Sequence, residues 1–203
     1  MLKLLPAYEH AVIVRSREPG ELAKCNIVVD VGAKYEPENN LFDHHQREFT
    51  GVLGDGFNTK LSSAGLVYKH FGKDIISHIC LMNNANSDTI IDKHLIDTMY
   101  IRLYQGFIEH IDAIDNGISV SESPPLYYVS TTLSSRVGQL NPAWNQPQSD
   151  EVYNDNFKLA MELTCTEFLT TLDGLLNTWY ANILPYYTIL YFTAYYVVML
   201  YYN

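Results

Sequence analysis

Short apolar runs alternate with stretches of helical periodicity along this chain. The runs at 11–15 and 27–31 are rich in valine and isoleucine, which is typical of short buried strands. A short helix is predicted between them at 18–24. Because the order is strand, helix, strand, the two strands are expected to pair in parallel. The pattern therefore predicts an α/β fold with a parallel sheet.

The rest of the chain is predicted to be mainly helical. Apolar residues recur every three or four positions in five further segments, at 62–71, 73–82, 88–115, 131–140 and 152–176. Gly72 is expected to end the first of these helices and Gly117 to follow the third, since glycine readily adopts the left-handed conformation found after helices. Loops rich in Asn, Glu, Pro or Ser are predicted at 35–40, 83–87 and 119–125.

The charge of the chain narrows the function classes. Its 23 acidic and 13 basic residues give a formal net charge of −10 over 203 residues, which argues against a broad basic surface for nucleic acid. Bound cations can still supply local positive charge to an acidic protein. The three cysteines are far apart, so they indicate reduced thiols and neither a disulfide framework nor a cysteine zinc site.

The composition changes sharply near the end of the sequence. Every residue after Asp173 is uncharged, and 183–202 is almost entirely apolar and aromatic. This stretch is just long enough to cross a bilayer, but no Lys or Arg flanks it and tyrosines occur in its middle, so a membrane span is not favoured. We divide the chain into an α/β domain at 1–145, a helical extension at 146–179 and a divergent apolar tail at 180–203.

The run Asp43-His44-His45 is the first candidate for chemistry. It lies between Phe42 and Phe49, and three adjacent polar side chains that can bind metal are poor material for a core. A carboxylate with neutral imidazoles suits Mn²⁺, Fe²⁺ or Zn²⁺, whereas Mg²⁺ prefers oxygen ligands. The alternative is a solvated turn.

A second carboxylate, Asp30, ends the predicted strand at 27–31, just before Gly32. Ligands in open α/β sheets bind outside the carboxyl ends of the strands, where this side chain is expected to lie. A turn or capping aspartate is the alternative.

Two further carboxylates, Asp112 and Asp115, fall in the last turn of a predicted helix and share one face. Carboxylates at a helix C-terminus oppose the helix dipole, and a bound cation would reverse that unfavourable placement. A solvated carboxylate pair is the alternative.

Ser62 and Ser63 open a predicted helix, with Lys60 just before them. The free amides and partial positive charge of a helix N-terminus bind phosphate readily. Ser62 as a simple helix cap is the alternative.

Five segments in order carry a resemblance to a known family, at 28–32, 42–49, 59–65, 111–117 and 140–145. Together they closely resemble the melanocyte proliferating gene family of eukaryotes, which is similar to the DHH phosphoesterase superfamily. The resemblance implies a metal-dependent 3′ to 5′ RNA exonuclease of nucleus and mitochondrion. It implies single-stranded RNA or short nucleotides as substrate, Mn²⁺ with Mg²⁺ as the alternative cofactor, and no obligate protein partner. The cytoplasm is a further location that does not depend on the resemblance.

The resemblance also implies roles for single residues. Asp30 is expected to bridge two metal ions, His44 to ligate one of them and Asp115 to ligate from the helix end, with Asp112 as a further candidate ligand. His45 is expected to face the scissile phosphate, and Asp43 is the second candidate catalytic residue. The candidate substrate-binding residues are Lys60, Ser62, Ser63 and Arg47.

The chain departs from the family pattern at its front. Met1 to Tyr8 resembles the end of the family's first helix, so the family's opening strand and the His-Cys-Asp motif after it are expected to be missing. The sheet would then lack one strand, and both metal ions would lack ligands. Three readings follow: an incomplete copy of an exonuclease, a non-catalytic remnant, or a protein tethered to a membrane by its tail.

Overall fold

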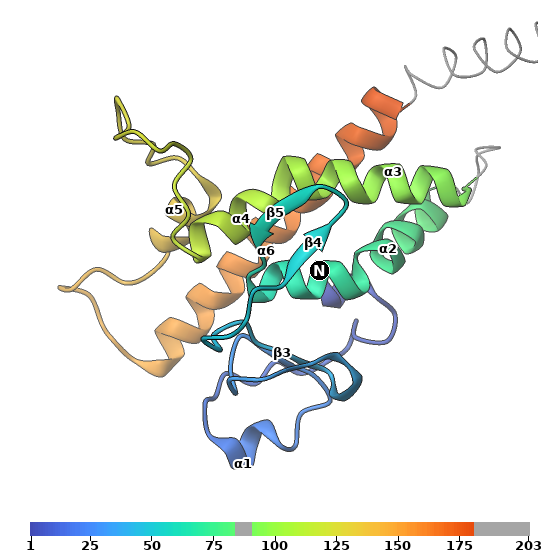
Figure 1. The fold of residues 1–203 in the computed structure, drawn as a ribbon. Coiled ribbons are helices and arrows are strands. Elements are labelled where there is room, and N and C mark those ends of the chain that lie inside the picture. Colours follow the sequence, from blue (N-terminus) through green and yellow to red (C-terminus); the bar gives the residue numbers. More distant parts are fainter. Residues whose placement is uncertain (84–90, 181–203) are drawn as a thin grey trace, which may run out of the picture.

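A computed structural model describes residues 1–83 and 91–180 of the chain. It is a mixed α/β structure in which helices pack beside a three-stranded sheet and a two-stranded hairpin. Figure 1 shows the three-stranded sheet at one end of the helical body and the hairpin lying over α4.

The three-stranded sheet is mixed, so the prediction of a parallel sheet is only partly met. Strand β1 (Val28–Val29) pairs in parallel with β3 (Leu41–Phe42), and β2 (Tyr35–Glu36) pairs with β3 in the antiparallel sense. The reason is a tight reversal between β2 and β3, formed by the 3₁₀ turn η2 (Pro37–Asn39) and by left-handed Asn40 with φ of 56°. The loop predicted at 35–40 therefore begins with a strand.

The predicted strand at 11–15 is wrong. The segment is irregular, no strand of the described chain pairs with it, and the side chain of Val12 is 87% exposed. Valine-rich segments are stable as strands when they pair with a sheet and bury one face. No strand of the described chain is available to pair with 11–15. The helix predicted at 18–24 is present as the shorter α1 (Pro19–Leu22).

The hairpin of β4 (Val52–Gly54) and β5 (Phe57–Lys60) was not predicted. Its turn is Gly54-Asp55-Gly56, and all three residues have positive φ. Such a glycine-rich turn is the local signal for a hairpin. The hairpin places Lys60 just before the first long helix.

Helix α2 (Ser63–Asn83) runs through Gly72, so the prediction that a helix ends there is wrong. A Cβ atom at Gly72 would lie 2.9 Å from the Tyr100 ring and 3.0 Å from the Tyr68 ring. These two rings stack with their centroids 4.9 Å apart. Gly72 therefore provides room for close helix packing.

The helix predicted at 88–115 consists of three parts, and residues 84–90 lie outside the described chain. Helix α3 (Lys93–Leu103) leads into the π-helical turn η3 (Tyr104–Ile108) and then into α4 (Glu109–Asp115). The Glu109 amide donates to the carbonyl of Tyr104, five residues earlier. A π turn takes up more residues than an α turn, so η3 sets the direction in which α4 side chains point.

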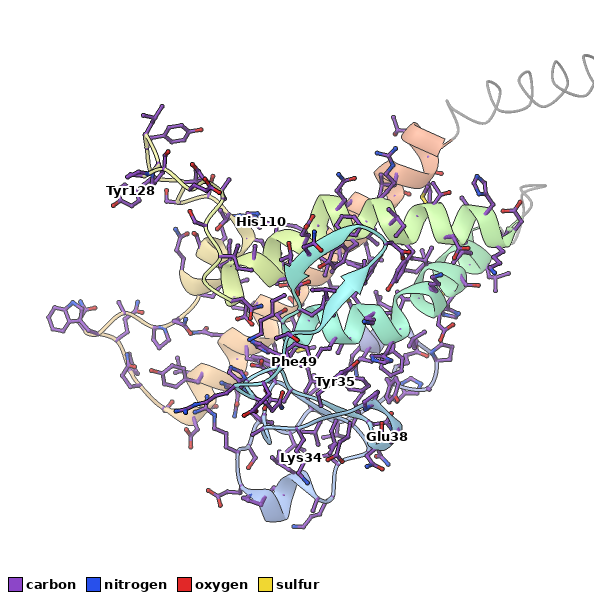
Figure 2. All side chains as sticks on the ribbon, in the orientation of Figure 1. Lys34, Tyr35, Glu38, Phe49, His110 and Tyr128 are labelled. Atoms are coloured by element: carbon purple, nitrogen blue, oxygen red, sulfur yellow. The ribbon has the colours of Figure 1, made fainter. Side chains whose placement is uncertain are left out.

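Two more predicted helices are present with shorter or shifted bounds. Helix α5 (Leu133–Gly138) is capped by Thr132, and α6 (Asp150–Gly174) continues into η4 (Leu175–Tyr180). The connection before α5 projects from the body, and Tyr128 on it is 96% exposed (Figure 2).

One core joins these elements. The 3₁₀ turn η1 (Leu2–Leu4) packs on α2, and Phe168 of α6 meets Phe107 of η3 with ring centroids 5.9 Å apart. Across 1–83 and 91–180, no helix has both the length and the hydrophobicity needed to cross a membrane. The apolar stretch at 183–202 lies outside the described residues.

Candidate metal centre

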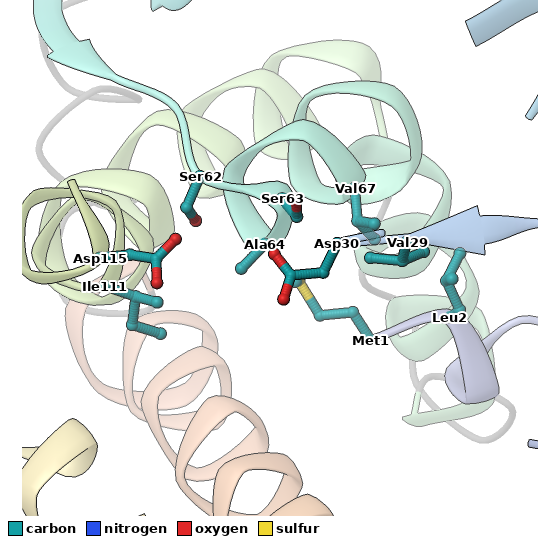
Figure 3. A pocket seen from close by; sticks show the side chains of 10 residues that line it. All are labelled: Met1, Leu2, Val29, Asp30, Ser62, Ser63, Ala64, Val67, Ile111 and Asp115. Carbon is teal, nitrogen blue, oxygen red and sulfur yellow. The ribbon is translucent and has the colours of Figure 1, made fainter. Parts of the chain in front are cut away.

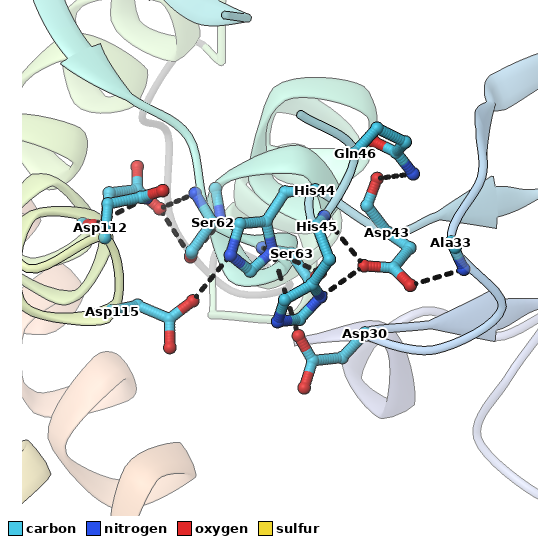
Figure 4. A network of polar contacts seen from close by, with 12 residues as sticks. Asp30, Ala33, Asp43, His44, His45, Gln46, Ser62, Ser63, Asp112 and Asp115 are labelled. Carbon is cyan, nitrogen blue, oxygen red and sulfur yellow. Dashed lines mark hydrogen bonds and ion pairs between the residues drawn. The ribbon is translucent and has the colours of Figure 1, made fainter. Parts of the chain in front are cut away.

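Asp30 and Asp43 emerge side by side because their strands are parallel neighbours. Val29 of β1 is in register with Phe42 of β3, so the next residue of each strand leaves the sheet at the same edge. The Asp30 amide donates to the Phe42 carbonyl at 3.0 Å, and Asp30 has φ of 69°. Asp30 therefore lies at the end of its strand, as expected, and the run Asp43-His44-His45 lies beside it (Figure 4).

His44 is buried at the centre of the cluster. Its Nδ1 accepts from the Ser63 amide at 3.1 Å and lies 3.0 Å from the Ser63 hydroxyl. Its Nε2 lies 3.1 Å from Asp115 Oδ2, and its Nδ1 lies 3.8 Å from Asp30 Oδ1. Burial lowers the pKa of the imidazole, although nearby Asp115 works in the opposite direction. A neutral imidazole is the form that ligates metals.

Asp43 holds His45 in place. Its buried carboxylate accepts from the Ala33 amide at 2.7 Å and from the His45 amide at 3.1 Å, and lies 2.5 Å from His45 Nδ1. Burial acts to raise the pKa of Asp43, but the hydrogen bonds from His45 and Ala33 outweigh it and the net shift is downward. The hydrogen bond to Asp43 raises the pKa of His45, whose side chain is 59% exposed.

The clustered side chains supply donor atoms of the types that hold a divalent cation, at a spacing slightly wider than around a bound ion. One ligand atom from each of Asp30, Asp43, His44 and His45 lies within 4.8 Å of the others. Asp115 extends this group through its 3.1 Å contact with His44. Neighbouring ligands around an octahedral ion, with bonds of about 2.1 Å, lie about 3 Å apart. Carboxylate oxygens with an imidazole nitrogen are also the ligand types expected for Mn²⁺, Fe²⁺ or Zn²⁺.

Asp112 lies outside this cluster. Its fully buried carboxylate accepts from the Ser62 amide at 2.9 Å, the Ser62 hydroxyl at 2.6 Å and the Tyr104 hydroxyl at 2.9 Å. A Cβ atom at Gly65 would be only 2.3 Å from it, so glycine permits this approach. Burial raises the pKa of Asp112 to about 6 against the pull of these donors. Its contacts join α4 to the start of α2.

The predicted phosphate-binding groups, the Ser62 and Ser63 amides, already donate hydrogen bonds to side chains of the protein. The Ser62 and Ser63 amides point to Asp112 and His44, and the Ser62 hydroxyl accepts from the Gly65 amide at 3.3 Å, as a helix cap does. The Lys60 ammonium lies 5.7 Å from the centre of the Phe49 ring. Arg47 is exposed in a turn after His45.

A pocket opens beside the cluster (Figure 3). Its volume is about 370 Å³, and Asp30 and Asp115 face each other across it. Ser62 and Ser63 also line it, whereas Lys60, Arg47 and Asp112 do not. The remaining lining residues are Met1, Leu2, Val29, Ala64, Val67 and Ile111.

Two residues that hold candidate carboxylates in place were not found from the sequence. Ala33 offers only a backbone amide, which no side-chain pattern reveals, and its φ of 52° aims that amide at Asp43. Tyr104 reaches Asp112 from eight positions earlier, a spacing that regular helix geometry does not predict. The π turn at η3 accounts for it.

Comparison with known proteins places the chain in a family. A family described as "Uncharacterised protein family (UPF0160)", named for MYG1 exonuclease, matches residues 1–185. The MYG1 exonucleases of Bos taurus and Homo sapiens are 46% and 45% identical over 185 residues, which is 88% of this chain. A MYG1 protein of Saccharomyces cerevisiae is 37% identical over 186 residues.

The match covers only part of each relative. The aligned region is 46% of the bovine protein, 47% of the human protein and 53% of the yeast protein. The chain therefore spans about half the length of the curated relatives it matches. No solved structure matches it significantly. With a family match over most of its length and relatives this similar, the chain belongs to the MYG1 family.

Proposed function

We propose that this chain carries the metal-dependent site of a phosphodiesterase that removes nucleotides from the 3′ end of RNA. The observation that carries the proposal is that Asp30 and Asp115, which line one pocket, both lie close to the buried His44 imidazole beside the Asp43–His45 pair. The name exonuclease of the mammalian relatives supports the reaction class.

Asp30, His44 and Asp115 are the residues that would hold the cation, and Mn²⁺ suits their mixture of oxygen and nitrogen. Asp43 is a weaker candidate ligand because the protein already donates hydrogen bonds to both of its oxygens. A bound divalent ion would supply Lewis acidity toward a phosphate oxygen and lower the pKa of a water molecule.

We assign the transfer of a proton to His45. Asp43 fixes the ring through Nδ1, which leaves Nε2 to face the substrate, and a carboxylate partner holds an imidazole in one orientation and favours its charged form. In the charged form His45 donates to the scissile phosphate or to its leaving oxygen. Ser63 contributes by fixing the His44 ring from the first turn of α2.

The substrate preference follows from the same contacts. A site that holds phosphate through a cation and an imidazole reads no base edge, so weak sequence preference is expected. The net charge of −10 argues against tight binding along a long strand. We therefore propose single-stranded RNA ends or short oligonucleotides as substrates.

The test is Mn²⁺-dependent release of mononucleotides from the 3′ end of a labelled single-stranded RNA by the full chain. Asp30→Ala and His44→Ala are expected to abolish the release, and EDTA to abolish it in the parent protein. Asp155→Ala is the matched control, because its carboxylate is 62% exposed, as is that of Asp30, but lies on α6.

Two outcomes would contradict the proposal. Release that persists in EDTA would exclude the metal, and full release by Asp30→Ala would exclude this site. Binding of Mn²⁺ without any release of nucleotides would instead favour a non-catalytic metal-binding protein.

A further inference from the structure

A second pocket adjoins the first one. It has a volume of about 350 Å³ and lies among α5, α6, η3 and the first turns of α2 and α4. The two pockets share Met1, Ala64 and Ile111 in their walls. The two pockets are therefore direct neighbours on either side of these shared residues.

The two pockets differ in chemistry. The first presents two carboxylates and two serines, whereas the second is mostly apolar and has the rings of Phe107 and Phe168 in its wall. These rings meet edge to face at an interplanar angle of 78°. Aromatic and aliphatic walls of this kind favour a flat apolar group.

Two hydroxyl groups interrupt the apolar lining of the second pocket. Thr164 Oγ1 donates to the Ala160 carbonyl at 2.8 Å, so its oxygen remains available to accept. The hydroxyl of Ser134 makes no hydrogen bond to any described residue, so it can donate or accept. One hydroxyl that accepts and one that can also donate can together pair with the polar edges of many different rings.

The outer wall of the second pocket is held firmly in position. Thr132 caps α5 by accepting from the Ser135 amide at 3.1 Å. Arg136 forms a bidentate pair with Glu167 of α6, with 2.7 Å between Nη2 and Oε2. A wall fixed by such contacts loses little further freedom when a ligand enters.

We propose that the second pocket binds the nucleobase of a nucleotide whose phosphate lies at the first pocket. A nucleotide joins an anionic phosphate to a flat, largely apolar ring, and the two adjoining pockets offer surroundings for each end. The volume is near the lower end of the range for small-molecule pockets, which suits one ring system and not a longer strand. The assignment of phosphate to the first pocket rests on the proposed function.

The test compares AMP with ribose 5-phosphate, which carries the same phosphate and sugar without a base. Their dissociation constants are measured by equilibrium dialysis against the full chain in Mn²⁺. The protein is expected to bind AMP about tenfold or more tightly than ribose 5-phosphate, as the contribution of one base indicates. Val137→Phe fills the pocket from α5 and is expected to remove this preference.

Gln139→Phe is the matched control, because it adds the same ring at the exposed end of α5, outside the pocket. It is expected to keep the preference for AMP. Ser134→Leu provides a second way to fill the pocket if Val137→Phe does not fold, which circular dichroism will show.

Equal affinities for AMP and ribose 5-phosphate would overturn the inference, as would failure of the parent protein to bind AMP. A preference for AMP that survives in folded Val137→Phe and Ser134→Leu would also overturn it. None of these measurements requires hydrolysis, so a failure of the exonuclease assay alone is distinguished from a failure of the base pocket.

Discussion

Asp112 and Asp115 lie one helical turn apart on α4, yet their surroundings are opposite. Asp112 is fully buried and accepts hydrogen bonds from Ser62 and Tyr104. The Asp115 side chain is 49% exposed, lines a pocket and contacts the imidazole of His44. The same residue type in the same turn is therefore closed off by the protein in one case and open to solvent in the other.

The difference shows what separates a structural carboxylate from one available to a cation. The oxygens of Asp112 are filled by donors from the protein, so a cation there would have to displace hydrogen bonds from a closed site. Among the described residues, the one ion pair of Asp115 is with the His44 imidazole, and its side chain lines the first pocket. Three residues of spacing predict a shared face, but the donors around each carboxylate decide its role.

The largest expected effect comes from removing the buried carboxylate of Asp112. Asp112→Ala leaves the Ser62 amide and the Ser62 and Tyr104 hydroxyls without their acceptor, so we expect a loss of about 3–5 kcal/mol in the free energy of unfolding. Urea denaturation at pH 7 measures it. Asp115→Ala is the control and is expected to change stability by less than about 0.5 kcal/mol. Similar losses for both variants would remove the distinction.

The protonation of Asp112 gives the second effect. Its pKa is raised to about 6 in the folded protein, so the folded state holds the proton more tightly than the unfolded chain. The stabilisation of the folded state by this proton is fully present below the pKa of Asp112 in the unfolded chain, which is near 4. It is lost as the pH rises through 6, and the free energy of unfolding then falls by roughly 3 kcal/mol. Unfolding of the parent protein and Asp112→Asn across this range measures the difference. A constant difference would contradict the raised pKa.

The third prediction concerns Mn²⁺ binding at the exposed carboxylate of Asp115. A hundredfold excess of Mn²⁺ over its dissociation constant stabilises a protein that binds it only when folded by about 2.7 kcal/mol. We expect this stabilisation in the parent protein and in Asp112→Asn, and its loss in Asp115→Ala. Thermal unfolding with Mn²⁺ and with EDTA measures it. Stabilisation that depends on Asp112 and not on Asp115 would reverse the assignment.

The smallest expected effect comes from removing one hydrogen-bond donor to Asp112, the Tyr104 hydroxyl. Tyr104→Phe removes only the hydroxyl that donates to Asp112, and we expect a loss of about 1 kcal/mol in the free energy of unfolding. Mn²⁺ stabilisation is expected to stay as in the parent protein. A loss of Mn²⁺ binding in this variant would show that the buried network and the open cluster are one unit.

The sequence predicts the helices well and the sheet poorly. Periodicity indicates α2, α3 with α4, α5 and α6, since a buried helix face leaves a clear pattern. The strands are two to four residues long, too short for alternation to identify, and 11–15 has strand composition without a partner. Gly72 was misassigned for a similar reason. The sequence does not distinguish a glycine that makes room for two tyrosine rings from a glycine that ends a helix.

The meeting of the candidate residues was expected from the family resemblance and not from strand order. Asp30 and Asp43 follow parallel neighbours, but 41–42 was not recognised as the strand beside 27–31. The separation of Asp112 from Asp115 could not be anticipated from the sequence, because it depends on where Ser62 and Tyr104 point after packing. The use of the Ser63 amide to hold His44 is likewise a tertiary contact.

The π turn at η3 makes the site depend on one residue of helix length. A regular α-helix rotates by about 100° per residue, so removing the exposed Gly106 from the turn would rotate the face of α4 by about that angle. Asp112 would leave its donors and Asp115 would leave His44, although every side chain in the cluster would be unchanged. The cluster is thus as sensitive to a single deletion in η3 as to the loss of one of its side chains.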